Sequence, residues 1–413
     1  MKTVSIKNIG PIISLKLSLN KVNVIIGPQG SGKSTIAKIL SYCEWVEKRY
    51  ILDGEYKYDF MEKFMVFHRI EKSFFSDRSL IIYESDYIKL TLKGRVPKHE
   101  IVSKKEVYNF LNSKNIFIPA ERNFVSVVPN LGQYKEANDN IMNFIYDWYD
   151  AKKNYSTSKR LPILNFNISY FHIKKTDSDR LILNNLKKGF SLETASSGLQ
   201  SITPLLILVD YLTNGIYKKE SLNSVKEKEN INDLITKYFK RLAESDFNNF
   251  LKVADNKDDI SFAIERKNLE KILEIVKRRI FYSFSQFIIE EPEQNLFPLS
   301  QRDLIYYLIK KVNDNRRDHK ILITTHSPYI LYALNNCIMG YNIKERVKSD
   351  NNFEFQSKES WINPEKVSIW EIDSKTGSLI NIQNKDNGTV DKNYFNNVMN
   401  ELMDEYYEML DIL

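Results

Sequence analysis

An eight-residue stretch near the start of the chain, GPQGSGKS at 27–34, has the residue types and spacing of a phosphate-binding loop. Its glycines let the backbone curl so that several N–H groups point at one anion. The lysine ammonium can reach the outer phosphates of a nucleotide, and the serine hydroxyl can take a place on Mg²⁺. An apolar run at 22–26 precedes the stretch and a helical pattern follows it, which is an arrangement that holds anions at a helix N-terminus. The sequence therefore predicts a nucleotide phosphate site here.

A second stretch, FIIEE at 287–291, places two adjacent carboxylates after an apolar strand. One of them, Glu290, can hold Mg²⁺ through water, while Glu291 orients an attacking water. In a parallel sheet, ligands bind at this carboxyl end of the strands. The alternative, a pair of exposed edge carboxylates, fits poorly beside so apolar a strand. We therefore expect the pair to serve the same nucleotide.

Two further stretches have weaker patterns. His326 lies just past the apolar run at 321–325, where a sensor of the γ-phosphate would be wanted, although a lone histidine can also be structural. ASSGLQS at 195–201 opens an apolar helix with free N–H groups and hydroxyls, which can bind an anion. Taken alone, the ASSGLQS stretch favours a helix start without a ligand.

The elements that must position these residues can be read from the hydrophobic pattern. Antiparallel hairpins are expected where a plain Rossmann unit has none, with turns at 8–11 and near Ser85–Asp86. A helix is expected over 298–314, capped by Ser300, between the strands that end in the acidic pair and in His326. The remaining expected elements are a strand at 115–119, a strand pair within 166–184, helices over much of 201–284, a hairpin at 367–382 and an amphipathic helix at 395–406.

Composition sets broad limits on the class of protein. With 413 residues, 42% hydrophobic and 27% charged, the chain is an ordinary soluble globular protein of one large or two modest domains. Its two cysteines, Cys43 and Cys337, argue against a disulfide scaffold or a cysteine-based metal site. The sequence has neither a membrane-spanning apolar run nor a secretory signal pattern, so we expect a cytoplasmic protein. The net charge of +7 permits nucleic-acid binding without demanding it.

The order of the motifs resembles that of ABC-type ATPases: phosphate loop, SSGLQ, an apolar strand ending in EEPE, then TTHS. The resemblance is to the soluble branch that includes RecF, the SMC heads and the OLD-type ATPases. The chain is most similar to the compact AAA-family ATPases of bacterial anti-phage systems, such as Septu-, PARIS- or retron-associated subunits. IFIPAERN at 116–123 and NYFNNVMNELMDEYYEML at 393–410 also look like that group.

The resemblance implies an α/β fold, a P-loop NTPase with an ABC-type ATPase head and a helical lobe. The head would combine a mixed sheet with an antiparallel β-subdomain and span 1–413 as a single unit. Within it, 1–135 would form the N-terminal part of the nucleotide-binding lobe, 136–285 the signature motif and a helical insertion, and 286–413 the Walker B strand, switch histidine and closing hairpin and helix.

The resemblance also implies roles for single residues, with ATP and Mg²⁺ as cofactors. Glu291, His326 and Lys33 would be catalytic, and Ser34 and Glu290 would hold the metal. ATP would contact the phosphate loop and, across a dimer, the signature segment: Gly27, Pro28, Gln29, Gly30, Ser31, Gly32, Lys33, Ser34, Thr35, Ser197 and Gly198.

The chain departs from the family pattern in two places. Glu290 replaces the commoner aspartate, which moves the carboxylate out by one methylene. The glutamine that usually links the metal to the helical lobe has no clear counterpart. Gln133 is a candidate by its order along the chain, and Glu121 or Arg122 could serve instead.

The leading functional hypothesis is an ATP-hydrolysing subunit that dimerises through nucleotide, senses a trigger and regulates or scaffolds a separate nuclease or toxin in anti-phage defence. A homodimer or higher homo-oligomer is expected, with no membrane partner. The alternative is a RecF-like repair or recombination ATPase that binds DNA. A P-loop kinase for a small molecule is a third class, which SSGLQ and the switch histidine disfavour. A transporter ATPase is disfavoured because the EEPE strand resembles the soluble branch.

Overall fold

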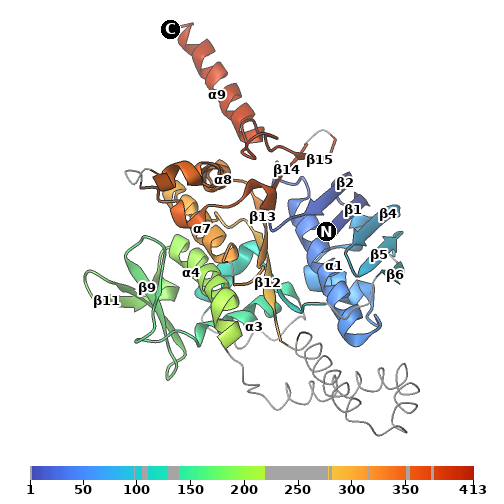
Figure 1. Ribbon diagram of the computed structural model, residues 1–413, viewed down its shortest axis with the longest axis horizontal. Coiled ribbons are helices and arrows are strands. Elements are labelled where there is room, and N and C mark those ends of the chain that lie inside the picture. Colours follow the sequence, from blue (N-terminus) through green and yellow to red (C-terminus); the bar gives the residue numbers. More distant parts are fainter. Residues whose placement is uncertain are drawn as a thin grey trace.

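The computed structural model describes residues 2–96, 98–104, 110–128, 139–218, 278, 281–314, 316–349, 354–373 and 376–413. Figure 1 shows the arrangement of the helices and strands. Gln133 and most of the helical pattern expected over 201–284 lie outside the described residues.

A six-stranded sheet forms the centre of the molecule, in the order β15-β14-β3-β13-β12-β7. The strands from β14 to β7 are parallel to their neighbours, and β15 pairs antiparallel with β14. Every residue of β3 is buried, as expected for a parallel strand covered on both faces. The bounds are β3 Val22–Ile26, β7 Ser113–Ile118, β12 Phe284–Glu290, β13 Lys320–Thr325, β14 Val367–Ile372 and β15 Leu379–Asn381.

Two hydrophobic cores lie on opposite faces of this sheet, because side chains alternate along each strand. Ile25, Ile288 and Leu322 pack on one side with helix α1 (Lys33–Asp53) and an antiparallel sheet. Val24 and Ile289 pack on the other side with the remaining core helices. Those helices are α3 Asn140–Lys152, α4 Ser197–Asp210, α7 Pro298–Val312 and α8 Pro328–Ser349.

The antiparallel sheet beside α1 has five strands in the order β2-β1-β4-β5-β6. Its hairpins turn at the two places that the sequence predicts, after Ile9 and after Glu84. The bounds are β1 Lys2–Ile9, β2 Ile12–Leu19, β4 Phe75–Glu84, β5 Ile88–Lys93 and β6 Lys98–Ser103. The mixed sheet, this antiparallel subdomain and the helices confirm the predicted α/β fold class.

A second antiparallel sheet, of four strands in the order β11-β10-β9-β8, lies on the side of α4 (Figure 1). It includes the strand pair expected within 166–184. The bounds are β8 Leu161–Pro162, β9 Ile168–Ile173, β10 Ser178–Leu183 and β11 Lys188–Ser191.

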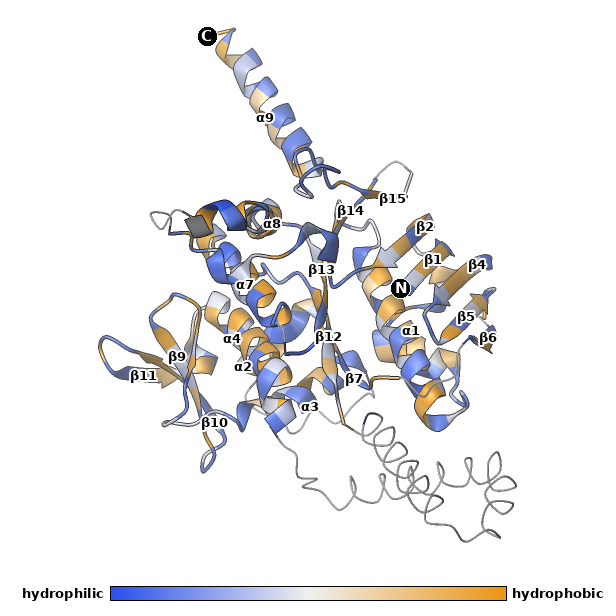
Figure 2. Cartoon of the chain, in the orientation of Figure 1, coloured by the Kyte–Doolittle hydropathy of each residue, from blue (hydrophilic) through white to orange (hydrophobic). Residues whose placement is uncertain are grey.

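The shorter helices connect these layers, and one long helix stands apart from them. The short elements are the π-helices Met61–Val66 and Tyr211–Gly215, the 3₁₀ helices Lys72–Phe74, Ala120–Asn123, Leu192–Thr194, Ile216–Lys218, Lys358–Ser360 and Pro364–Lys366, and α2 Phe124–Val127. The long helix, α9 Tyr394–Leu410, extends away from the layered body (Figure 1) and carries both hydrophobic and hydrophilic residues (Figure 2). No helix among the described residues is both long enough and apolar enough to span a membrane.

One helix boundary differs from its prediction. Ser300 was expected to cap the helix before β13, but α7 begins at Pro298, and Phe297 holds the extended backbone of the N-cap position. Proline suits the first helical turn because its fixed φ is helical and its missing N–H would have no partner there. Proline chemistry therefore starts this helix two residues before Ser300.

Candidate nucleotide-binding site

The predicted phosphate site lies between β3 and α1, at the carboxyl edge of the central sheet. Gly27 to Gly32 form the connecting loop, and Lys33, Ser34 and Thr35 form the first turn of α1. Gly32 precedes the helix with φ of 100°, and a Cβ there would lie 2.9 Å from Cγ1 of Ile12 in the β1–β2 hairpin. Only glycine fits this conformation and this close approach. The antiparallel subdomain therefore supports the phosphate loop from one side.

The Lys33 side chain lies inside the loop. Its Nζ donates to the carbonyl oxygens of Gly27 at 2.7 Å and Pro28 at 2.8 Å. Burial lowers the pKa of Lys33 to about 8, while the negative charges of Glu291 and Glu293 raise it. The ammonium thus stays mostly protonated at neutral pH, in the concave side of a loop whose N–H groups can face phosphate oxygens.

The two predicted metal residues, Ser34 and Glu290, lie side by side. Glu290 ends β12 and is only 5% exposed, and its Oε1 has no hydrogen-bond partner. Burial raises the pKa of this carboxyl to about 7, while a hydrogen bond from the Ser34 hydroxyl and the charge of Lys38 lower it. A buried carboxylate with an unused oxygen beside a hydroxyl fits the oxygen ligands that Mg²⁺ takes at phosphate sites. The residues present therefore fit the implied metal.

Glu291 and His326 are brought together from the ends of two neighbouring strands. Oε1 of Glu291 lies 3.4 Å from Nε2 of His326, and each side chain is about one-third exposed. Glu291 has a left-handed backbone with φ of 43°, which turns its side chain away from the path of β12. Burial, then the nearby Lys33 charge, lowers the pKa of His326 against the opposing effect of Glu291. The imidazole is therefore mostly neutral at pH 7.

Glu293 is a third acid that the sequence analysis did not assign. Its Oε1 accepts the backbone N–H of His326 at 2.6 Å, and burial raises its pKa. It thereby ties the loop after β12 to the turn after β13. The repeated glutamates of EEPE are the only signal in the sequence, and they do not distinguish a catalytic acid from a structural one.

Arg122 holds the backbone of the acidic segment. Its guanidinium is fully buried and donates to the carbonyl oxygens of Glu290 at 2.9 Å, Glu291 at 2.7 Å and Pro292 at 3.1 Å. Burial lowers its pKa to about 10, so it remains cationic at neutral pH. Glu121 pairs with Arg69 at 2.9 Å, and alongside burial its negative charge helps to raise the pKa of Glu290. Within the IFIPAERN segment, Arg122 is therefore a positioning residue for Glu290 and Glu291.

The signature residues Ser197 and Gly198 form the first turn of α4. Ser196 occupies the N-cap position without a side-chain capping bond, and both Ser196 and Ser197 are exposed. A Cβ on Gly198 would lie 2.8 Å from the carbonyl oxygen of Asn295, in the loop after the acidic pair. The start of α4 is thus packed against that loop, with its hydroxyls facing outward.

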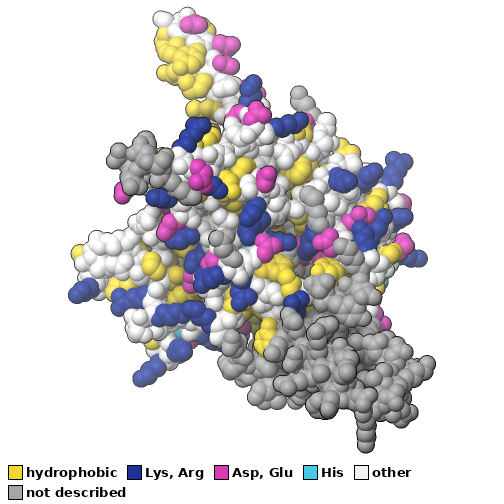
Figure 3. All heavy atoms as spheres, viewed as in Figure 1, with side chains coloured by type: hydrophobic (Ala, Val, Ile, Leu, Met, Phe, Trp, Pro, Cys, Tyr) yellow, Lys and Arg dark blue, Asp and Glu magenta, His cyan; other side chains and the backbone are white. Residues whose placement is uncertain are grey.

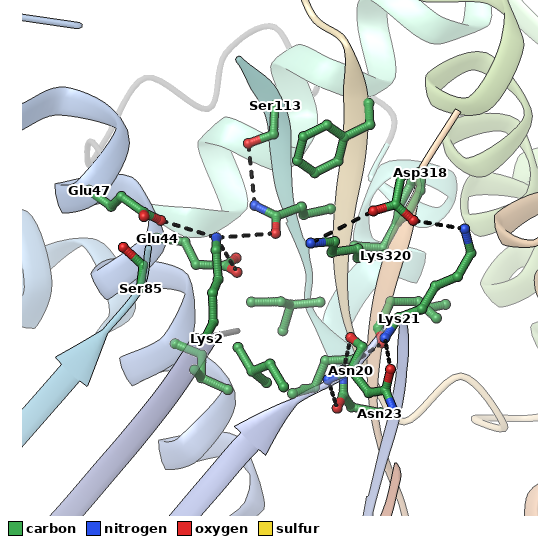
Figure 4. A pocket seen from close by; sticks show the side chains of 18 of the residues that line it. Lys2, Asn20, Lys21, Asn23, Glu44, Glu47, Ser85, Ser113, Asp318 and Lys320 are labelled. Carbon is green, nitrogen blue, oxygen red and sulfur yellow. Dashed lines mark hydrogen bonds and ion pairs between the residues drawn. The ribbon is translucent and has the colours of Figure 1, made fainter. Parts of the chain in front are cut away.

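A separate cavity of about 460 Å³ lies at the opposite edge of the sheet, at the start of β12 and β13. Lys2 enters it and forms ion pairs with Glu44 at 3.3 Å and Glu47 at 3.1 Å (Figure 4). None of the predicted site residues lines this cavity. The predicted nucleotide-site residues therefore lie apart from this cavity.

A comparison with known protein families gives a match over part of this site. A family model described as an AAA ATPase domain matches residues 285–331, a range that holds the acidic pair and His326. The prediction of an ATPase is thereby confirmed. No curated protein matches the chain.

Several solved structures match over nearly the whole chain at low identity. An SMC head domain from Thermotoga maritima is 9% identical with a TM-score of 0.39, covering 92% of this chain and 98% of that one. The ATP-binding cassette of an ABC transporter in its ADP conformation is 11% identical, with a TM-score of 0.32 and coverage of 94% and 93%. The recombination mediator protein RecF is 12% identical, with a TM-score of 0.31 and coverage of 92% and 97%.

Proposed function

We propose that the chain is an ATP-driven switch, in which ATP closes a dimer and hydrolysis reopens it. The observation that carries this proposal is the contact of Glu291 with His326 at 3.4 Å. The pair lies close enough to the phosphate loop for the charge of Glu291 to raise the pKa of Lys33. A base, a neutral imidazole and a phosphate-binding ammonium in one place suit hydrolysis better than static binding.

Each side chain has a distinct task in this proposal. Lys33 and the loop N–H groups bind the β- and γ-phosphates, and the neutral His326 donates a hydrogen bond toward the γ-phosphate. Glu291 accepts a proton from the attacking water and orients it. Ser34 and Glu290 hold Mg²⁺, which when bound neutralises charge on the phosphates. Arg122 keeps the carboxylates in register through their backbone carbonyls.

The proposed dimer is supported by the outward-facing start of α4. Ser196 and Ser197 are exposed, and their hydroxyls and the free N–H groups of the first turn can meet the γ-phosphate of ATP on a second copy. Closing would then need both a nucleotide and a partner, and loss of the γ-phosphate would release them. This coupling makes nucleotide turnover a switch.

The switch is proposed to sense a trigger and to regulate or scaffold a separate nuclease or toxin in anti-phage defence. The support is the resemblance of the IFIPAERN and NYFNNVMNELMDEYYEML segments to ATPase subunits of such systems. The test is phage plating on cells carrying this chain together with its neighbouring genes. Protection that is lost with Glu291→Gln supports the proposal, and equal plating with and without the wild-type genes contradicts it.

A RecF-like DNA-binding ATPase is the second candidate, and the four-stranded sheet favours it. Residues 152–191 contain nine Lys and Arg residues but only two Asp residues and no Glu. The exposed ones include Lys174 and Lys175 before β10 and Lys187 and Lys188 at the start of β11, and Figure 3 shows Lys and Arg gathered on this lobe. A basic surface of this kind can contact a phosphate backbone. ATP turnover that rises with duplex DNA and falls steeply with salt would favour this candidate.

A further inference from the structure

Helix α9 is fixed at its base and free along its length. Asn393 caps it by accepting N–H groups of Phe395 and Asn396, and the N–H of Tyr394 donates to Glu371 of β14 at 2.9 Å. Phe395 packs against the main core. Not one of the seventeen residues of α9 is buried, all of them being described. The helix therefore leaves the body in a set direction, and the described part of the chain buries none of its side chains.

The apolar side chains of α9 follow the spacing of a helix bundle. Apolar residues recur at alternating spacings of four and three residues, as in a heptad repeat, and form a continuous line along one side of the helix, here called the seam. The seam residues are Phe395, Met399, Leu402, Tyr406, Met409 and Leu413. Four of them within the helix are more than half exposed, at 58% for Met399, 60% for Leu402, 54% for Tyr406 and 55% for Met409. An exposed apolar stripe of this length marks an interaction surface.

The seam is also wider than a two-stranded coiled coil requires. Val398, Met403, Leu410 and Ile412 occupy the positions that flank the seam, where two-stranded coiled coils usually carry charges. Glu405 is the one charged residue at a flanking position. A face this broad is covered by two or more neighbouring helices, as in a bundle of three or four.

The distribution of charges on α9 fits a second copy of the chain as the occupant. Residues 394–413 contain five acidic residues and no Lys or Arg. Four of these acids, Glu401, Asp404, Glu408 and Asp411, lie on the side opposite the seam, and Figure 3 shows magenta and yellow side chains on different sides of the helix. Copies can therefore pack seam to seam without burying these carboxylates. A membrane surface fits poorly, because helices that lie on membranes carry Lys and Arg on their polar face.

We propose that α9 is a homotypic interface, through which copies of this chain pack their seams into a bundle of three or four helices. By its length the bundle would run about 25 Å. A helix of this size gains most of its stability from packing of its apolar face. The contact lies away from the phosphate loop and needs no nucleotide. If the proposed ATP-dependent dimer also forms, the two contacts together build an assembly larger than either.

The experiment measures the mass of the full chain by light scattering without nucleotide. Wild type is expected at three or four times the chain mass of 48.6 kDa. The double variant L402E/Y406E places two carboxylates in the seam and should fall to the mass of one chain. The matched control N400E/Y407E also introduces two glutamates, at outward-facing positions one heptad apart, and should keep the wild-type mass.

Folding of the variants is checked by their ATP binding, because α9 contributes no buried side chain to the body. A wild-type chain that stays monomeric at tens of micromolar, or equal masses for the two double variants, would overturn the proposal. Flotation of wild type, but not of L402E/Y406E, with phosphatidylcholine vesicles would also overturn it. Failure of the ATP switch is distinguishable, since Lys33→Ala should lose ATP binding but retain the bundle mass.

Discussion

Replacing Glu290 by glutamine should stabilise the nucleotide-free protein while weakening its stabilisation by Mg²⁺ and ATP. The carboxyl is 5% exposed, and burial raises its pKa from the usual 4.5 to about 7. Holding it ionised in the folded state therefore costs free energy. A difference of this size corresponds to about 3 kcal/mol, at about 1.4 kcal/mol for each pKa unit. Glutamine has nearly the same shape and no charge to bury.

The sign of the pH dependence follows from proton linkage. Below about pH 4.5 the carboxyl is protonated in both the folded and the unfolded states, so wild type and Glu290→Gln should be equally stable. Between about pH 4.5 and 7 the unfolded state loses its proton first, and wild type loses stability relative to the variant. Above about pH 7 the full difference of about 3 kcal/mol should be present.

The assay is denaturant unfolding at pH 5 and pH 8, with and without Mg²⁺ and ATP. Mg²⁺ and ATP together should stabilise wild type at pH 8 more than they stabilise Glu290→Gln, since the variant keeps Lys33 and the loop but lacks the anionic metal ligand. Glu408→Gln removes an exposed carboxylate of α9 and is the matched control, expected to behave as wild type. A Glu290→Gln protein no more stable than wild type at pH 8, or a difference that is the same at both pH values, would show that the buried charge of Glu290 does not destabilise the folded state.

Two further predictions concern the residues that surround the acidic pair. Lys33→Ala should weaken ATP binding about 10- to 100-fold by titration calorimetry, because a charge-assisted hydrogen bond to phosphate is lost. Lys16→Ala, at an exposed position, is the control. Unchanged binding in Lys33→Ala would contradict the assignment of this loop to phosphate binding. Arg122→Met should lower the free energy of unfolding by about 3 kcal/mol, since buried carbonyl oxygens lose their donor. The exposed Arg69→Met should cost under about 1 kcal/mol, and equal losses for the two would contradict the positioning role of Arg122.

The sequence contained the local features of this fold. The phosphate loop, the hairpin turns and the strands that end at Glu290 and just before His326 each depend on residues that are close together along the chain, so pattern and spacing were sufficient to predict them. The start of α7 was displaced to Pro298 because proline and serine both signal a helix start, and proline sets φ directly. The domain boundaries at 135 and 285 stay predictions.

The unpredicted parts of the site depend on long-range contacts. Arg122 meets the carbonyl of Glu290 across 168 residues of sequence, and no pattern at PAERN specifies that guanidinium over the neighbouring Glu121. The approach of Gly198 to Asn295 and the hydrogen bond that the His326 N–H donates to Glu293 are likewise set by how β12, β13 and α4 pack. Hydrophobic spacing predicted α9 as an amphipathic helix but not that its apolar face would be exposed.

In the proposed switch, ATP closes a dimer, and hydrolysis assisted by Glu291 reopens it. Its most direct test is the mass of Glu291→Gln, in the L402E/Y406E background, before and after addition of ATP and Mg²⁺, alongside phosphate release with and without duplex DNA. We expect ATP to double the mass of this Glu291→Gln protein. The doubled species should persist, because phosphate and metal contacts survive while water activation is lost. The same background with Glu291 intact should release phosphate and return to its starting mass. A mass unchanged by bound ATP, or wild-type phosphate release by Glu291→Gln, would contradict it.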